Sequence, residues 1–298
     1  MAYNGVRSTA WITNASAVFL DFSLARYGRL SSHAADMTLF LPKATSMTDA
    51  PKLQDLTIKL FTDGADKAQI VAMAEKSWIR GFTTNPSLLK KAGIADYAGF
   101  GREIVAAVPD RHLSFEVFSD DIAEMVAQAH TIARWGDNVY VKLPVTTTRG
   151  EPLYEAVRSL SREGVKVNMT AIFTADQVAR AVDALAGGAP ACVSVFAGRL
   201  ADFGYDYRPL MSAAVAHARA TANVEIIWAS TREPFNVVEA DAIGCHIITA
   251  PADVLNKLPA LATRTGAELS LDAVRAFRQD ALAAGLSLPA AAACQAAE

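Results

Sequence analysis

The chain has 298 residues, 52% hydrophobic and 20% charged, with a formal net charge of −3 at pH 7. This length and composition indicate a globular protein of one large or two small domains. The lack of a Lys/Arg block argues against a nucleic-acid-binding surface. No apolar run reaches the ~18–20 residues that a membrane-spanning helix needs, so we expect no membrane partner.

Three cysteines, Cys192, Cys245 and Cys294, lie far apart in the sequence, with no CxxC or Cys/His cluster. This spacing favours neither a disulfide framework nor a structural zinc site. A reducing, cytoplasmic setting fits these cysteines best.

Residues 1–46 carry scattered apolar residues without a stable period, and Asp21 interrupts the apolar part that a signal peptide would need. Met47 stands just ahead of the first predicted strand. We therefore expect residues 1–46 to be an extension, either not translated or disordered, with the natural start at Met47. Residues 47–298 then form the catalytic domain.

From about residue 57, runs rich in β-branched and aromatic residues alternate with stretches of helical periodicity. The predicted strands are 57–63, 80–84, 113–118, 138–144, 165–170, 192–197, 224–230 and 245–251. The clearest predicted helices between them are 66–78, 119–135, 151–164 and 174–188. Capping residues agree: Ser119 or Asp120 begins the second of these helices, Gly164 ends the third, and Gly187 follows the fourth.

The predicted strands recur about every 20–33 residues, the length of one strand–helix unit. Eight such units predict a (β/α)8 barrel. An open, doubly wound sheet is the alternative, weakened because no GxGxxG follows the first strand. An additional helix, 270–285, begins after Ser270. It either covers the bottom of the barrel or packs on a neighbouring subunit.

Polar residues fall at the carboxyl ends of the predicted strands, where this kind of barrel performs its chemistry. Buried polar groups there are costly unless they pair, so a ring of them favours a functional site. The eighth strand offers little. The members from strands 1 to 7 are Asp63, Thr83, Thr84, Asn85, Glu116, Lys142, Asn168, Thr170 and Ser194, then Arg199, Ser230 and Arg232.

Lys142 lies in the apolar run VYVKLPVT, residues 139–146. It is either one partner of a structural ion pair with Asp63 or Glu116, or a nucleophile. Burial lowers the pKa of a lysine, and a neutral amine attacks a carbonyl to form a Schiff base. The two carboxylates are then candidates for proton transfer.

Metal-dependent carbonyl chemistry would need converging His, Asp or Glu ligands. None of the five histidines falls at the carboxyl end of a predicted strand, so we expect no metal and no cofactor. Arg199 and Arg232 follow adjacent strands and suit phosphate oxygens, with Ser230 as a further donor. They predict a phosphorylated carbonyl substrate, most simply a sugar phosphate. Two surface arginines in weak salt bridges are the alternative.

Several motifs resemble the transaldolase family, which includes the fructose-6-phosphate aldolases, over roughly residues 57–260. The two most specific are GFTTNPSLL (81–89) and VYVKLPVT (139–146). VNMTAIFTADQ (167–177), SVFAGRLADFG (194–204) and WASTRE (228–233) match more loosely. The resemblance implies a Schiff-base transferase of the pentose phosphate pathway that moves a dihydroxyacetone unit between sugar phosphates.

The resemblance also implies roles for individual residues. Lys142 would form the Schiff base, and Asp63 would take the proton from the hydroxyl whose carbon–carbon bond breaks. Glu116 would act through a water positioned by Thr170. The substrate-binding positions would be Thr84, Asn85, Asn168, Ser194, Phe196, Arg199, Ser230 and Arg232.

Glu116 and Phe196 resemble the transferase branch, because the aldolase branch has glutamine and tyrosine there. Thr231 and Glu233 depart from the family pattern, which leaves room for a variant sugar. An aldolase that releases dihydroxyacetone stays an alternative, as does a sugar-phosphate-binding protein without catalysis. The segment AVRAFRQD is similar to short family members whose last helix packs across subunits, which implies a homo-oligomer.

Overall fold

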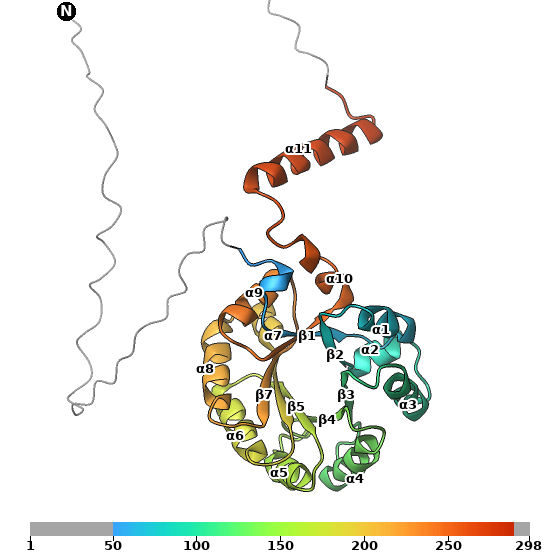
Figure 1. Cartoon of the computed structure of the whole chain (residues 1–298), viewed down its shortest axis with the longest axis vertical. Coiled ribbons are helices and arrows are strands. Elements are labelled where there is room, and N and C mark those ends of the chain that lie inside the picture. The colour runs from blue at the N-terminus through green and yellow to red at the C-terminus, as the bar shows by residue number, and fades with distance from the viewer. Residues whose placement is uncertain (1–49, 289–298) are drawn as a thin grey trace, which may run out of the picture. The chain divides into compact units, whose positions relative to one another are not determined.

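A computed structural model describes residues 50–288 of the chain (Figure 1). Eight parallel strands, each hydrogen-bonded to the next along the chain, close into one barrel from β1 to β8. This confirms the predicted (β/α)8 barrel with an additional C-terminal helix and removes the open-sheet alternative. The predictions about residues 1–46 lie outside the described residues.

The observed strands match the predicted runs to within two residues at each end. They are β1 (Lys59–Asp63), β2 (Ile79–Thr83), β3 (His112–Glu116), β4 (Val139–Pro144), β5 (Val167–Ile172), β6 (Ala191–Val195), β7 (Val224–Trp228) and β8 (Ile247–Pro251).

At least one helix follows every strand and covers the outside of the barrel (Figure 1). In chain order these are α1 (Lys67–Ala74), α2 (Pro86–Lys91), α3 (Tyr97–Ala107), α4 (Ile122–Ala133), α5 (Tyr154–Arg162), α6 (Ala175–Leu185), α7 (Ala197–Asp202), α8 (Arg208–Ala218), α9 (Phe235–Ala242) and α10 (Ala252–Leu255). Short 3-10 turns precede β1 at Leu53–Asp55 and follow α10 at Leu258–Ala260.

The predicted beginning of α4 is wrong by one or two residues. Asp121, rather than Ser119 or Asp120, caps the helix by accepting from the N–H of Glu124. Asp120 instead accepts from the N–H of Thr148 at 2.7 Å, a contact 28 residues away that a local pattern does not reveal. The predicted ends hold, since Gly164 and Gly187 follow α5 and α6 with φ of 93° and 72°, which glycine adopts without strain.

Apolar side chains fill both faces of the strands, as expected for parallel strands covered by helices. A smaller cluster of Phe61, Cys192, Ile227, Ala229 and Ile247 packs separately. The thiols of Cys192 and Cys245 are free and buried. Because successive side chains point to opposite faces of a strand, the polar residues of β3 to β6 lie on one common face of these strands. Ser114 on β3 bonds Asn168 on β5, two strands away, so that face is the interior of the barrel.

The last helix, α11 (Gly266–Ala283), begins after Thr265, which accepts from the N–H of Glu268 in a capping box. The predicted cap at Ser270 is therefore wrong. No residue of α11 is buried, and Leu271, Val274 and Phe277 are exposed. The two expectations for this helix, a cover over the bottom of the barrel or a contact with a neighbouring subunit, both stay predictions. Within residues 50–288, no helix is long and apolar enough to cross a membrane.

Candidate active site

Lys142 lies on β4 in register with Glu116 on β3 and Asn168 on β5. Its Nζ donates to Glu116 Oε1 at 2.8 Å and to the carbonyl oxygen of Thr84. The two side chains of this pair are only 10% and 8% exposed. The structure therefore brings together the predicted lysine and one predicted carboxylate in a buried contact.

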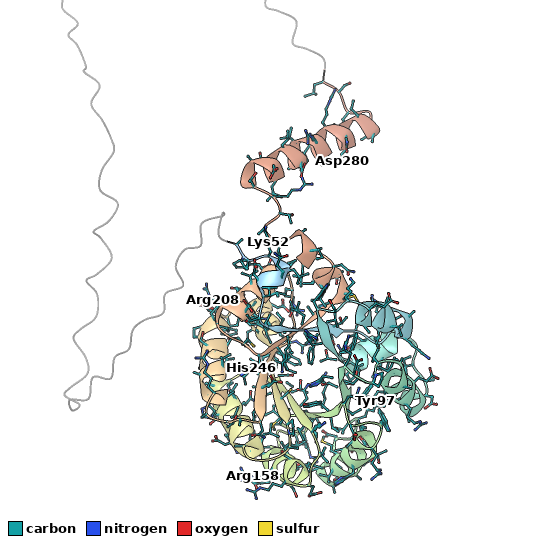
Figure 2. The ribbon with its side chains drawn as sticks, viewed as in Figure 1. Lys52, Tyr97, Arg158, Arg208, His246 and Asp280 are labelled. Atoms are coloured by element: carbon teal, nitrogen blue, oxygen red, sulfur yellow. The ribbon has the colours of Figure 1, made fainter. Side chains whose placement is uncertain are left out.

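Glu116 is held from two further directions. Thr84 Oγ1 donates to Glu116 Oε2 at 2.7 Å. The hydroxyl of Tyr97, on α3 (Figure 2), accepts from the Glu116 N–H at 2.7 Å and lies 3.4 Å from Oε2. The hydroxyl and the carbonyl oxygen of Thr84 are both engaged with the Lys142–Glu116 pair, so the binding of substrate by Thr84 stays a prediction. Tyr97 was missed, because no sequence signal links the start of α3 to a carboxylate on β3.

Asp63 ends β1 on the other side of the site. Thr83 Oγ1 donates to its Oδ1 at 2.8 Å, and Asn85 Nδ2 donates to its Oδ2 at 3.1 Å. Burial raises the pKa of Asp63 above its ordinary value, although the positive charge of Lys142 opposes the shift. This carboxyl group therefore keeps its proton to higher pH than an exposed aspartate.

The eighth strand also contributes to the site, contrary to the prediction that it offers little. Thr249 Oγ1 lies 2.6 Å from Thr83 Oγ1, which in turn bonds Asp63. A lone threonine in an apolar strand is most often part of the core, which explains why the sequence did not single it out.

Asn168 and Ser194 bond each other inside the barrel. Ser194 Oγ donates to Asn168 Oδ1 at 2.7 Å, and Asn168 Nδ2 donates to Ser114 Oγ at 3.1 Å. Both residues are buried, so this chain fixes the orientation of the Asn168 amide beside Lys142. Ser114 was not predicted as a site residue.

Thr170 has a buried hydroxyl with no hydrogen-bond partner among the described residues. The β5–β6 register shifts between Met169 and Ile172, the stretch that contains Thr170, and Ala171 has a φ of 61°, unusual for a residue with a side chain. Such local distortion often aims a side chain at a functional site. Thr170 can therefore hold a water or a substrate group.

The predicted phosphate-binding residues lie together beyond β6 and β7. A Cβ at Gly198 would be 1.6 Å from the carbonyl oxygen of Ser230 and 3.2 Å from Arg232 Cγ. Only glycine permits this approach, which sets the start of α7 against the loop after β7. Ser230 itself has a φ of 66°.

The two arginines at this end differ in their partners. Arg232 Nε donates to Asp202 Oδ1 at 3.0 Å, and its Nη2 donates to Oδ2, a two-pronged ion pair. Arg199 is exposed, and its guanidinium lies 5.4 Å from the ring centre of Phe196. Across residues 50–288, Arg199 has no carboxylate within salt-bridge distance. The alternative of a surface salt bridge thus describes Arg232 but not Arg199.

Phe196 does not continue strand 6 as predicted. Its φ of −85° and ψ of 62° place it as the cap of α7, and its ring contacts Phe173 at 5.4 Å between centres. As for metals, no group of three or more His, Cys, Asp or Glu side chains comes together in the described part of the chain.

The architecture and site define a class of protein: a (β/α)8 barrel with a buried lysine–carboxylate pair and a second carboxylate at the carboxyl ends of its strands. Residues 60–297 match the family model described as Transaldolase/Fructose-6-phosphate aldolase. The chain belongs to this family.

Curated relatives named "Probable transaldolase" support the assignment. The one from Dehalococcoides mccartyi is 38% identical over 202 residues, covering 67% of this chain and 90% of that protein. One from Methanococcus maripaludis is 39% identical over 202 residues, covering 67% and 89%. One from Streptococcus equi subsp. zooepidemicus is 37% identical over 228 residues, covering 75% and 97%.

Among solved structures, the deoxyribose phosphate aldolase from Aeropyrum pernix is similar with a TM-score of 0.48 and 13% identity. The match covers 69% of this chain and 92% of that one.

Proposed function

We propose that this protein is a Schiff-base transaldolase that transfers a dihydroxyacetone unit from a ketose phosphate, such as fructose 6-phosphate or sedoheptulose 7-phosphate, to an aldose phosphate. The observation that carries the proposal is the buried contact of Lys142 Nζ with Glu116 at 2.8 Å, at the carboxyl end of β4. The reaction needs no metal and no cofactor, because the lysine itself supplies the electron sink.

The lysine amine attacks the ketose carbonyl and, after loss of water, leaves an iminium. Asp63 takes the proton from the hydroxyl on the carbon that will leave. The bond between this carbon and the carbon next to the iminium then breaks, and its electron pair converts the iminium into an enamine. The first aldose leaves. The enamine then adds to the acceptor aldehyde, Asp63 returns the proton, and water releases the new ketose from Lys142.

Glu116 and Thr170 act in the proton transfers that form and hydrolyse the imine. This role is supported by the 2.8 Å contact of Glu116 Oε1 with Nζ and by the Thr170 hydroxyl, which has no hydrogen-bond partner among the described residues and could hold the water. Asn85 and the Asn168–Ser194 pair bind substrate hydroxyls by exchanging their present hydrogen bonds.

The phosphate is bound by Arg199, Ser230 and Arg232. Arg199 has its guanidinium free of carboxylates among the described residues, while Arg232 would exchange Asp202 for a phosphate oxygen. Because a guanidinium group fits both a carboxylate and a phosphate, replacing Asp202 by phosphate requires little rearrangement of Arg232.

The transferase is favoured over the aldolase because position 196 is Phe. Its ring packs on Phe173 and carries no hydroxyl that could deliver a proton to the enamine. The enamine then persists until an aldehyde arrives. An aldolase that releases dihydroxyacetone is the second candidate, and a non-catalytic sugar-phosphate-binding protein is disfavoured because binding alone needs no buried amine.

Assays with fructose 6-phosphate, with and without erythrose 4-phosphate, separate these functions. The proposal expects turnover only with the acceptor. Acceptor-independent release of dihydroxyacetone would identify the aldolase instead, and Lys142→Met is expected to bind sugar phosphate without turnover.

The protein is further proposed to be a cytoplasmic homo-oligomer. Leu271, Val274 and Phe277 on α11 are exposed at three-residue spacing, and a second subunit would cover such an apolar side. Light scattering of the whole chain tests this: a monomer in solution would contradict it.

A further inference from the structure

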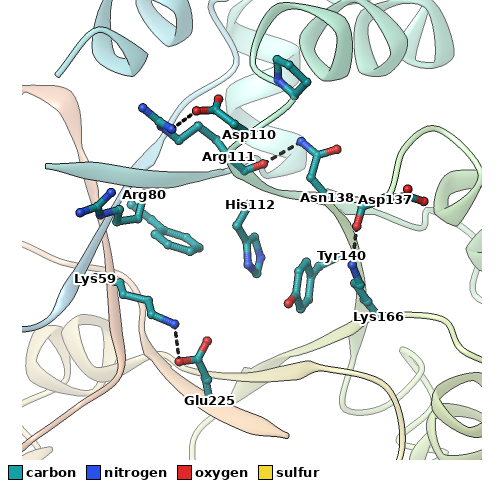
Figure 3. Close-up of a pocket in the computed structure, with 12 residues that line it drawn as sticks. Lys59, Arg80, Asp110, Arg111, His112, Asp137, Asn138, Tyr140, Lys166 and Glu225 are labelled. Carbon is teal, nitrogen blue, oxygen red and sulfur yellow. Dashed lines mark hydrogen bonds and ion pairs between the residues drawn. The ribbon is translucent and has the colours of Figure 1, made fainter. Parts of the chain in front are cut away.

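A hollow of about 480 Å³ opens among residues at the amino ends of the strands (Figure 3). Lys59 and His112 are the first residues of β1 and β3, and Tyr140 and Glu225 are the second residues of β4 and β7. Because the strands are parallel, the hollow lies at the opposite end of the barrel from Lys142. Its volume is in the range of sites for small molecules.

Four cationic and three acidic side chains line this hollow. Glu225 pairs with Lys59 at 2.7 Å, and Asp110 pairs with Arg111. Figure 3 shows the carboxylate of the third acid, Asp137, turned away from the centre.

The other two cations have no such partner. Across residues 50–288, neither Arg80 nor Lys166 lies within salt-bridge distance of a carboxylate. Lys166 Nζ donates only to the backbone carbonyl of Asp137. The charge that remains uncompensated in the hollow is therefore positive.

A buried donor at the same place also lacks a partner. Arg111 Nε is shielded from solvent and makes no hydrogen bond among the described residues. The Arg111 side chain as a whole is 19% exposed. The other guanidinium nitrogens of Arg111 bond Asp110 and the carbonyl oxygen of Ala74, so the cations open to a ligand are Arg80 and Lys166.

His112 and Tyr140 form part of the wall of the hollow. His112 is stacked on Tyr140 at 3.7 Å between ring centres. Burial, together with the charges of Lys59 and Lys166, lowers the pKa of His112 to about 3. At neutral pH His112 is therefore uncharged, and the positive charge of the hollow comes from its lysines and arginines.

We propose that this hollow binds a small anion carrying two phosphoryl groups, held mainly by Arg80 and Lys166. The cations enter from different sides: Figure 3 shows Arg80 and Lys166 across the hollow from each other. A single phosphate would engage one side, whereas two linked phosphoryl groups engage more than one. Guanidinium and ammonium donors at unpaired sites are suited to phosphoryl oxygens. The site is separate from the phosphate-binding residues proposed beyond β6 and β7.

Calorimetric titration of the whole chain with pyrophosphate tests the proposal. The variant Arg80→Met/Lys166→Met is expected to bind pyrophosphate at least tenfold more weakly than the wild type. Arg102→Met/Lys257→Met removes the same charges from exposed positions outside the hollow and is expected to bind as the wild type does. Arg232→Ala, at the opposite end, is expected to keep this binding.

Transaldolase turnover of the Arg80→Met/Lys166→Met variant is expected to be unchanged, which makes the test independent of the proposed reaction. If that variant unfolds, the single change at the exposed Arg80 provides the comparison. Equal affinity in the wild type and the Arg80/Lys166 variant would overturn the proposal. So would loss of all pyrophosphate binding in Arg232→Ala, or no binding heat with the wild type at millimolar pyrophosphate.

Discussion

The chemical properties of Lys142 depend on its buried contact with Glu116 and not on its charge alone. A buried amine against one carboxylate satisfies the rule that buried charges are paired. In the proposed reaction, the same contact holds a carboxylate against the amine that forms the Schiff base. The sequence left Asp63 and Glu116 open as partners of Lys142, and the structure pairs the lysine with Glu116.

Asp63 leads to a prediction about pH. In the proposed reaction Asp63 is the general base and must be ionised, and its pKa is raised above the ordinary value of 3.8. The acid limb of the pH–rate profile is therefore expected above pH 3.8, with turnover falling as pH decreases through the raised pKa. Asp63→Asn is expected to lose about 10²–10⁴-fold in kcat.

Asp253→Asn, at an exposed position on α10, is the matched control and should retain the wild-type profile. An Asp63→Asn variant with the wild-type rate would remove Asp63 from the mechanism.

We expect Tyr97 to be a positioning residue, because its hydroxyl contacts Glu116 and its effect on the reaction would pass through that residue. Tyr97→Phe leaves the buried N–H of Glu116 without its acceptor and is expected to cost about 1–3 kcal/mol of unfolding free energy. It also frees the carboxylate to turn, so kcat should fall more than KM changes. Chemical denaturation and steady-state kinetics measure the two effects. Tyr205→Phe, at an exposed tyrosine, is the control; equal behaviour of the two variants would contradict this role.

Tyr97 also shows where reading the sequence by residue type fails. Its partner is 19 positions away, on another element, and the contact depends on how α3 packs on β3. Local patterns carry no information on that packing.

At the scale of elements, the site depends on how the strands end and the helices begin. Asn85 has both functions: its Oδ1 caps α2 by accepting from the Leu88 N–H at 3.0 Å, and its Nδ2 donates to Asp63. The signature around residue 85 is thus a helix cap as well as part of the site, and local capping rules identify only the first function.

Two substitutions at this position separate the functions. Asn85→Ala removes the cap and is expected to cost about 0.5–2 kcal/mol of stability. Asn85→Asp keeps a capping oxygen but places a second carboxylate against Asp63, which raises the pKa of Asp63 further.

The acid limb of the rate profile should therefore move to higher pH in Asn85→Asp than in Asn85→Ala. Thermal unfolding and pH–rate profiles of both variants test this. Acid limbs at the same pH in the two variants would show that Asn85 does not act on Asp63.

Element boundaries and the C-terminal helix were less predictable than the strands. Periodicity places a strand but not its last residue, because ends such as that at Phe196 are set by backbone turns. Helix α11 begins at the capping box of Thr265 rather than after the predicted cap Ser270. Glu268, in the first turn of the helix, completes this capping box.

At the scale of the whole molecule, the barrel was predictable because eight similar units repeat along the chain. Each strand buries apolar residues against the helix layer, and each is followed by a helix. The hollow at the amino ends was not predictable, because its lining comes from the starts of strands scattered over the sequence.

The buried His112 makes global stability depend on pH. Its pKa is about 3 in the folded protein against an ordinary 6.5, so between these values the unfolded chain binds a proton that the native state excludes. Stability from this group is present above pH 6.5 and is lost as pH falls toward 3. The loss is up to about 1.4 kcal/mol per pH unit.

His112→Gln should have a shallower dependence of unfolding free energy on pH between 6.5 and 5 than the wild type. Urea denaturation at several pH values measures it. Parallel curves for the two proteins would contradict the account of His112.

The central claim is that Lys142 captures a ketose as a Schiff base. The most direct measurement is mass spectrometry of the peptide containing Lys142 after incubation with fructose 6-phosphate and sodium borohydride, which reduces the iminium to a stable secondary amine. The account predicts a three-carbon adduct on Lys142, absent without sugar and absent in Lys142→Met. An unmodified Lys142, or the same adduct on another lysine, would contradict it.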